Sequence, residues 1–277
     1  MEIETLLREK KAIIDAALEE YLKEEDTPIF RAMRYSVLNG GKRIRPILSL
    51  ITYEAAGGND LEEIIPIACG IELIHSYSLI HDDLPCMDDD DFRRGKPSSH
   101  KVFGEGVATL AGDGLFAFAF EVFTRSRSER KIEVIQDIAG ITGPKGVVAG
   151  QEMDIRSGKE RSPALLRKTH FHKTALFITG SIRAGAIIAN VPEPILDHLT
   201  RGGKCLGMLF QITDDLLDLD EKGTEEERLT YPSIYGVEST RFRAKGYATR
   251  ANHYFEKAGK DFKVLNHFTR FVLHRKR

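Results

Sequence analysis

The sequence predicts an all-α protein, and three observations support this prediction. Apolar residues recur at helical spacing along most of the 277 residues. Strand-like alternation between turns is scarce, and strands do not alternate with helices as they would in a parallel sheet. Glycine and proline breaks are short, and none is long enough to be an interdomain linker. We therefore expect a single domain over residues 1–277.

The expected helices lie at residues 3–22, 61–84, 105–124, 169–189, 202–219 and 239–274. Pro66 is compatible with the second of these helices only near its first turn, because proline lacks a backbone N–H and its ring clashes with the preceding turn. The third segment is apolar enough to be deeply buried. The fourth repeats small residues, such as Gly180 and Ala184, which allow close contact between helices.

The bulk composition argues against several classes of protein. The chain is 42% hydrophobic and 30% charged, as soluble globular proteins are. A net charge of −2 without a long basic stripe argues against a nucleic-acid binder. Residues 1–11 lack the apolar core of a secretory signal, and no run reaches the roughly 18 apolar residues of a membrane span. Three cysteines without CxxC spacing indicate reduced thiols and a cytoplasmic protein.

Two aspartate clusters are the strongest chemical signal in the chain. They are DDLPCMD at residues 82–88 and DDLLD at residues 214–218. Crowded carboxylates raise one another's pKa unless a cation lies between them. Mg²⁺ takes oxygen ligands and commonly bridges one or two carboxylates to substrate phosphates. Two such clusters facing each other would hold a Mg²⁺-diphosphate and help the diphosphate to leave.

Acidic runs are more often solvated helix ends than metal sites. Each cluster follows an apolar run, so its first carboxylates emerge from a core helix. Asp214 and Asp218 are spaced i, i+4 on one helix face, where like charges destabilise the helix and require a compensating cation. The solvated alternative remains open for residues 89–91.

Basic residues form the counterpart of these clusters. The segment GGKRIRP at residues 40–46 offers three cations beside a glycine turn, which can grip a phosphate or form a solvated basic loop. Arg93 and Arg94 directly follow the first cluster, where they can contact a phosphate or neutralise the aspartates before them. Lys173 and Gln211 lie in apolar helical runs, and neither indicates a function by itself.

Together these segments resemble the trans-prenyltransferases, the short-chain polyprenyl diphosphate synthases. The resemblance runs from about Leu6 to the C-terminus and rests on GGKRIRP at 40–46, HSYSLIHDDLPCMDDDDFRRGKPSSH at 75–100, AGD at 111–113, GQEMD at 150–154, HKT at 172–174, FQITDDLLD at 210–218 and TYP at 230–232. The likeness is greatest to bacterial-type farnesyl diphosphate synthases, which also carry two extra residues inside the first aspartate motif.

This resemblance implies a fold and a reaction. The fold is an isoprenoid-synthase-type helical bundle with the two aspartate motifs facing each other across a central cavity, normally as a homodimer. The reaction condenses isopentenyl diphosphate head-to-tail with C5 and C10 allylic diphosphates and releases diphosphate. The expected product is farnesyl diphosphate (C15), with a geranylgeranyl diphosphate (C20) synthase as the alternative and a non-catalytic subunit of a prenyl synthase as a more remote one.

The resemblance also implies roles for individual residues. Two or three Mg²⁺ ions, with Mn²⁺ as an alternative, would be bound by Asp82, Asp83, Asp88, Asp214, Asp215 and Asp218. The allylic diphosphate would contact Arg93 and Lys173, and isopentenyl diphosphate would contact Lys42, Arg45, His75 and Arg94. Thr174 and Gln211 would line the allylic site. The catalytic set comprises Asp82, Asp83, Asp88, Arg93, Lys173, Thr174, Gln211 and Asp214.

Product length is expected to depend on Tyr77, which lies five residues before Asp82 and therefore about 7.5 Å back along the helix. In the family that the chain resembles, a bulky residue at this position acts as a floor that stops chain growth, whereas Ser78 is too small to block it. The alternative is that Tyr77 packs in an ordinary helix interface. A terpene cyclase would not need a second diphosphate site, so Lys42, Arg45 and Arg94 argue against that class.

The chain departs from the family after the second motif. Arg228 stands where the family has a lysine, and residues 220–227 form a shorter loop than usual. Residues 124–131 are also short. These differences leave the loop-derived phosphate contacts open.

Overall fold

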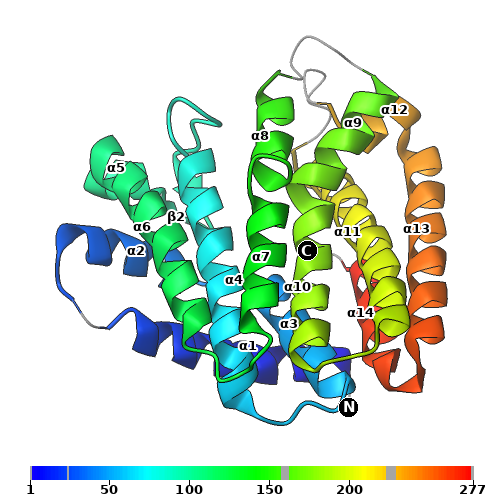
Figure 1. Cartoon of the computed structure of the whole chain (residues 1–277). Helices are drawn as coiled ribbons and strands as arrows, with labels where there is room; N and C mark the ends of the chain where they lie inside the picture. Colours follow the sequence, from blue (N-terminus) through cyan, green and yellow to red (C-terminus); the bar gives the residue numbers. More distant parts are fainter. Residues whose placement is uncertain (1, 24, 157–161, 223–228, 276–277) are drawn as a thin grey trace. The chain divides into compact units, whose positions relative to one another are not determined.

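The computed structural model describes residues 2–23, 25–156, 162–222 and 229–275, with side chains at 220–222 excepted (Figure 1). The shortened loop at 220–227 and Arg228 lie outside these residues, apart from the backbone of 220–222. Helices dominate the described chain, which confirms the all-α prediction. The chain folds into two compact units: unit 1 is Met1–Leu50 with Asn59–Ile135, and unit 2 is Ile51–Gly58 with Gln136–Arg277.

Unit 1 contains α1 (Ile3–Tyr21), α2 (Pro28–Leu38), α4 (Leu61–Asp82), β1 (Phe92–Arg93), β2 (Lys96–Pro97), α5 (Ser99–Phe103) and α6 (Glu105–Thr124). Strands β1 and β2 pair antiparallel in a small hairpin. Helices α3 (Ile44–Ala55) and α7 (Lys131–Thr142) each have residues in both units.

Unit 2 contains α8 (Val147–Arg156), α9 (Pro163–His170), the π-helical turn η2 (Phe171–Ala175), α10 (Leu176–Ile188), α11 (Glu193–Lys222), α12 (Tyr231–Tyr235), α13 (Val237–Ala258), the 3₁₀ turn η3 (Lys260–Phe262) and α14 (Lys263–His274). Helix α11 packs against both α10 and α13. Gly207 permits the close approach of α11 to η2, because a Cβ there would overlap the backbone of Ala175.

Helix α4 is the core helix of unit 1 and packs against α6 (Figure 1). Both helices are long and apolar enough to cross a membrane by composition alone, but 67% of the most apolar window of α4 is buried inside the protein. Gly70 allows the close contact between the two helices, since a Cβ there would overlap the ring of Phe123. Burial of this kind is what the core helix of a globular protein shows.

Pro66 lies inside α4, beyond the first turn to which the sequence analysis assigned it. Helix α4 begins at Leu61, with Asp60 as its N-cap. Proline cannot donate to the Glu62 carbonyl, and Arg127 N donates to that oxygen instead, at 3.2 Å. The next carbonyl, of Glu63, accepts from Ser126 Oγ at 2.6 Å. The chain after α6 therefore satisfies the carbonyl that proline leaves without its helical donor.

Three other predicted helices differ from the structure in ways that follow from the backbone. Helix α11 begins at Glu193, before the predicted start at 202, because Pro194 falls in its first turn, where proline is tolerated. The predicted helix 239–274 is two helices, divided at Gly259, whose φ is +138°. The predicted helix 169–189 contains the π-helical turn η2.

Candidate active site

The first aspartate motif forms the C-terminal end of α4 and the turn that follows it. Asp88 N donates to Asp82 O at 2.8 Å, which brings the two ends of the motif together. The side chain of Asp88 is exposed and that of Asp82 is partly buried. Apolar burial of α4 thus delivers Asp82 to the end of a core helix, as the sequence predicted.

Asp83 differs from its neighbours because it is buried, with 3% of its surface exposed. It accepts hydrogen bonds from Arg93 Nε, at 2.8 Å, and from Arg93 Nη2. Burial raises the pKa of Asp83, and the Arg93 guanidinium opposes this increase. Arg93 also pairs with Asp90 at 3.0 Å. The neutralising role considered for Arg93 is therefore observed, with Asp83 and Asp90 as its partners.

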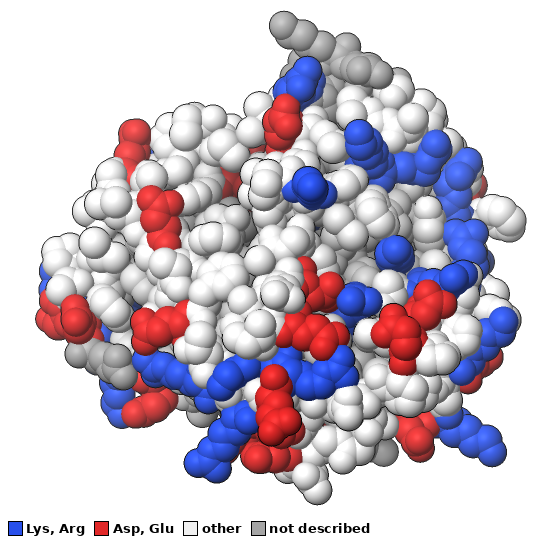
Figure 2. Space-filling model, viewed as in Figure 1, with Lys and Arg blue, Asp and Glu red and all other residues white. Residues whose placement is uncertain are grey.

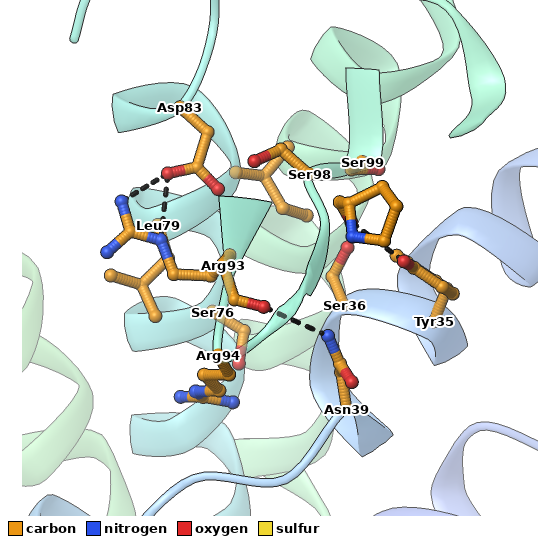
Figure 3. Close-up of a pocket in the computed structure, with 12 residues that line it drawn as sticks. Tyr35, Ser36, Asn39, Ser76, Leu79, Asp83, Arg93, Arg94, Ser98 and Ser99 are labelled. Atoms are coloured by element: carbon orange, nitrogen blue, oxygen red, sulfur yellow. Dashed lines mark hydrogen bonds and ion pairs between the residues drawn. The ribbon is translucent and has the colours of Figure 1, made fainter. Parts of the chain in front are cut away.

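Arg93, at the end of β1, and Arg94, in the turn after it, point in different directions (Figure 3). Figure 3 shows Arg93 turned toward Asp83. The Arg94 guanidinium instead lies against Gly41 and donates to the Gly40 carbonyl. A small cavity lies beside both residues, between α2, α4 and the hairpin. The hairpin thus directs Arg93 to the aspartate motif and Arg94 to the glycine turn.

The glycine turn also positions the other predicted ligands of isopentenyl diphosphate. Arg45 Nη1 lies 3.2 Å from His75 Nε2. Burial and the surrounding arginines, first Arg45 and then Arg94, hold the pKa of His75 well below its usual value. His75 is therefore neutral at pH 7 and accepts from Arg45. Lys42 is exposed on the same turn.

Arg43, the third cation of this segment, is buried and belongs to the core. It donates to Asp15 Oδ1 at 2.8 Å, Glu72 Oε1 at 2.7 Å and Val37 O at 2.6 Å. Its φ of +51° lies in the left-handed region. Arg43 fixes the turn to α1 and α4 and leaves Lys42 and Arg45 as the candidate phosphate ligands.

Tyr77 packs against α6, where an aromatic cluster continues from it. Its ring centroid lies 4.9 Å from that of Phe116 in an edge-to-face contact, and Phe116 lies 5.2 Å from Phe120. Tyr77 also contacts His81 at 5.5 Å. The neighbouring Ser78 donates its hydroxyl to the His75 carbonyl at 2.9 Å. The bulky and the small residue therefore stand side by side on α4, one turn before the aspartate motif.

The second aspartate motif lies on α11 in unit 2. Asp214 Oδ1 accepts from Arg275 Nη2 at 2.7 Å. The Arg275 side chain is only 3% exposed, and its guanidinium stacks over the Phe210 ring at 4.0 Å. Arg275 supplies the compensating cation that the i, i+4 spacing of Asp214 and Asp218 required. Sequence reasoning missed it, and the basic C-terminus was its only signal.

Asp215 lies at the centre of a buried hydrogen-bond chain. It accepts from Tyr231 N at 2.8 Å and from Gln211 Nε2 at 3.2 Å. Gln211 Oε1 in turn accepts from Thr174 Oγ1 at 2.8 Å. Burial raises the pKa of Asp215 to about 7, against the lowering effect of these two donors. This series of hydrogen bonds joins Asp215, Gln211 and Thr174 to the start of α12.

Lys173 lies in the π-helical turn η2, which widens the helix at this point; such turns are frequent at functional sites. Its Nζ donates to Asp154 Oδ2 at 2.6 Å. Asp154 is the last residue of the GQEMD segment, which carried no predicted role. Helix α8 comes close to η2 at Gly150, where a Cβ would overlap the Lys173 nitrogen.

The structure thus arranges the predicted residues in two groups. Unit 1 holds the first aspartate motif, Tyr77 and the basic residues of segments 40–46 and 93–94. Unit 2 holds the second motif with Lys173, Thr174 and Gln211. On the surface, acidic and basic side chains are interspersed over the face shown in Figure 2.

Comparisons of the sequence with a family model and with curated proteins indicate the same family. The polyprenyl synthetase family model matches residues 26–241. A farnesyl diphosphate synthase of Geobacillus stearothermophilus is 38% identical over 98% of this chain and 97% of its own. A chloroplastic geranylgeranyl pyrophosphate synthase of Catharanthus roseus is 42% identical over 83% of this chain and 68% of its own.

Solved structures agree with the sequence comparison. An FPP/GFPP synthase from Zymomonas mobilis superposes with a TM-score of 0.89 at 33% identity and covers 98% of both chains. A geranyltransferase from Legionella pneumophila gives a TM-score of 0.88 at 31% identity, over 99% of this chain and 97% of its own. The match extends over the helices that carry both aspartate motifs. The chain therefore belongs to the polyprenyl synthetase family of trans-prenyltransferases.

Proposed function

We propose that the protein condenses isopentenyl diphosphate with C5 and C10 allylic diphosphates, in a Mg²⁺-dependent reaction, and releases farnesyl diphosphate (C15) as its main product. The observation that carries the product length is the ring of Tyr77, packed on Phe116 before Asp82. An isoprenoid tail whose diphosphate is held at Asp82 grows along α4 past this level, about 7.5 Å away. The relatives are named for both C15 and C20 products, and the Tyr77 ring supports the shorter one.

The aspartates suit Mg²⁺ by their donor chemistry. The six predicted ligands are all carboxylates, the hard oxygen donors that Mg²⁺ prefers. Asp83 and Asp214 are also paired with arginines, which balance part of the crowded negative charge. Bound Mg²⁺ would stabilise the negative charge that develops on the departing diphosphate. We assign it to Asp82, Asp88 and Asp214, with Asp83, Asp215 and Asp218 in support.

The cationic side chains would act on the two diphosphates. Arg93 and Lys173 are held by Asp83 and Asp154, and each would turn part of its donor set to the allylic diphosphate as the C–O bond breaks. Lys42, Arg45 and Arg94 would bind isopentenyl diphosphate. Neutral His75 would orient Arg45 by accepting one of its N–H groups.

Thr174 and Gln211 would face the allylic cation with their oxygen dipoles. Their mutual hydrogen bond, 2.8 Å long, keeps both side chains fixed without adding a nucleophile that could trap the cation. Attack by the isopentenyl double bond, followed by loss of a proton to the departing diphosphate, then needs no covalent intermediate with the protein. We further propose that the protein is a homodimer, as the family resemblance implies, and that it is cytoplasmic, as its unpaired cysteines indicate.

The test is a product analysis with isopentenyl diphosphate and C5, C10 or C15 allylic diphosphates. We expect C15 from the wild type, loss of activity in EDTA and recovery with Mg²⁺. Tyr77→Ala should lengthen the product to C20 and beyond, because only the ring limits growth. Tyr77→Phe keeps the ring and Ser78→Ala leaves it untouched, so both should give C15. An unchanged product from Tyr77→Ala would remove Tyr77 as the floor, and C20 from the wild type would favour the geranylgeranyl alternative.

A further inference from the structure

Asp89, Asp91 and His100 form a cluster of donor atoms beside the first aspartate motif, outside the residues assigned above. One carboxylate oxygen from each aspartate and one ring nitrogen of His100 lie within 4.8 Å of one another. Among the described residues, this is the one set of three or more His, Cys, Asp or Glu side chains that converges in this way. The aspartates are exposed, whereas His100 is only 6% exposed.

The β-hairpin brings these residues together. Strand residues Phe92 and Pro97 pair directly, and Ser98 N donates to the Asp91 carbonyl at 2.9 Å. Helix α5 begins at the next residue and carries His100 in its first turn. Hydrogen bonds of the backbone therefore fix the His100 position relative to Asp91, independently of any ligand.

His100 gives the second indication of a ligand. Both of its ring nitrogens are buried, and neither has a hydrogen-bond partner in the described part of the chain. Buried polar atoms are paired in the great majority of cases, because an unpaired one costs about 1–3 kcal/mol. A ring nitrogen within reach of two carboxylates has a lone pair suited to a metal ion.

The chemistry of these three donor atoms indicates which metal ion would bind. Imidazole nitrogen together with carboxylate oxygen suits Zn²⁺, Co²⁺ or Mn²⁺ better than Mg²⁺, which prefers oxygen ligands alone. Ligand atoms around a tetrahedral Zn²⁺ at about 2.0–2.2 Å lie about 3.4 Å apart. The donor atoms of the cluster would therefore need to approach one another by little more than about 1 Å, with water completing the coordination.

We propose that Asp89, Asp91 and His100 form a binding site for a divalent transition metal, separate from the Mg²⁺ ligands Asp82 and Asp88. A metal here would join the loop after the first aspartate motif to α5 across the hairpin that carries Arg93 and Arg94. Lys101 opposes binding, because its ammonium pairs with Asp91 Oδ1 at 2.7 Å. This proposal does not depend on the prenyl-transfer function.

The test is calorimetric titration of the full chain with Co²⁺ in millimolar Mg²⁺ and without diphosphates, so that Mg²⁺ competes at sites made of oxygen alone. We expect one Co²⁺ site per chain. His100→Asn and Asp91→Asn should each weaken its binding by about tenfold or more, and Lys101→Gln should strengthen it by removing the competing cation. Asp91 is exposed, so its variant tests the site even if His100→Asn does not fold.

Asp82→Asn is the control for the aspartate motif and should leave Co²⁺ binding unchanged. Two results would overturn the proposal. The first is an absence of Co²⁺ binding in Mg²⁺; the second is a site that is lost in Asp82→Asn and kept in both His100→Asn and Asp91→Asn.

Discussion

Asp214 and Asp215 are adjacent in the sequence, yet they have opposite environments. Asp214 faces the Arg275 guanidinium, while Asp215 is buried against the backbone of Tyr231 and the amide of Gln211. Burial is the largest influence on the pKa of Asp215, and the charges of Asp214 and Asp218 add to it. Both Asp215 oxygens accept hydrogen bonds, so we expect this residue to position α11 against α12 as well as to support the metal site.

This environment predicts a pH dependence of stability in EDTA. With a pKa of about 7 when folded and about 3.9 when unfolded, Asp215 keeps a proton in the folded protein that the unfolded chain has lost. Its contribution to stability therefore falls as pH rises from about 4 to 7. Asp215→Asn should gain on the order of 2–3 kcal/mol in unfolding free energy relative to wild type between pH 5 and 8.

Urea denaturation at stepped pH measures this difference. The substitution also removes one hydrogen-bond acceptor, which should add a constant loss of about 1 kcal/mol and leave the slope unaffected. Asp197→Asn, exposed on the same helix and not among the charges that act on Asp215, should run parallel to wild type. A difference for Asp215→Asn that stays constant with pH would show that this carboxyl does not titrate in the window.

At the scale of elements, the Gly40–Gly41 turn positions the Arg94 guanidinium, which lies against it. A Cβ at Gly41 would lie 2.6 Å from Arg94 Cζ, whereas a Cβ at Gly40 would meet nothing within 4 Å. Both glycines have positive φ, +86° and +119°, so alanine strains the backbone at either position. Gly40→Ala is therefore a control for strain alone.

We expect Gly41→Ala to reproduce Arg94→Gln. Both should raise the KM for isopentenyl diphosphate by on the order of ten- to a hundredfold, the value of a lost charge-assisted contact. The KM for the allylic diphosphate should change less, and Gly40→Ala should have a smaller effect. Steady-state kinetics with each substrate varied in turn provides the measurement. Equal increases for both substrates would mean that the two diphosphate sites are assigned wrongly.

The contact between α8 and the π-helical turn η2 makes a second prediction at this scale. Gly150→Ala should destabilise the protein by about 1–3 kcal/mol, because its Cβ would overlap the Lys173 backbone and no flexible side chain can yield. It should also lower turnover by displacing Lys173. Gly140→Ala, exposed on α7 with nothing within 4 Å, should be neutral or stabilising by up to about 1 kcal/mol. Similar melting temperatures for the two variants would contradict this account.

At the scale of the whole chain, the features that the sequence predicted well are those with a local cause. The core helix that ends at Asp82 follows from the apolar run before it. The position of Asp214 and Asp218 on one helix face follows from their spacing. The partners Arg275 and Asp154 could not be predicted, because they lie 61 and 19 residues from the side chains they bind. The position of Pro66 within α4 likewise depends on a donor from Arg127, far along the chain.

The two aspartate motifs belong to different compact units, and the proposed reaction requires both to act on one diphosphate. Asp82→Ala and Asp214→Ala should each lower turnover by about a hundredfold or more, with the helical circular dichroism retained. If both residues serve the same leaving group, the double variant should be little worse than either single one, because residues acting as a unit are not additive. Asp261→Asn, on the exposed turn η3, controls for the loss of a carboxylate. If the fold loss of turnover in the double variant equals the product of the two single losses, the motifs act as two independent sites. Turnover within a few-fold of wild type in either single variant would contradict the shared metal-diphosphate site.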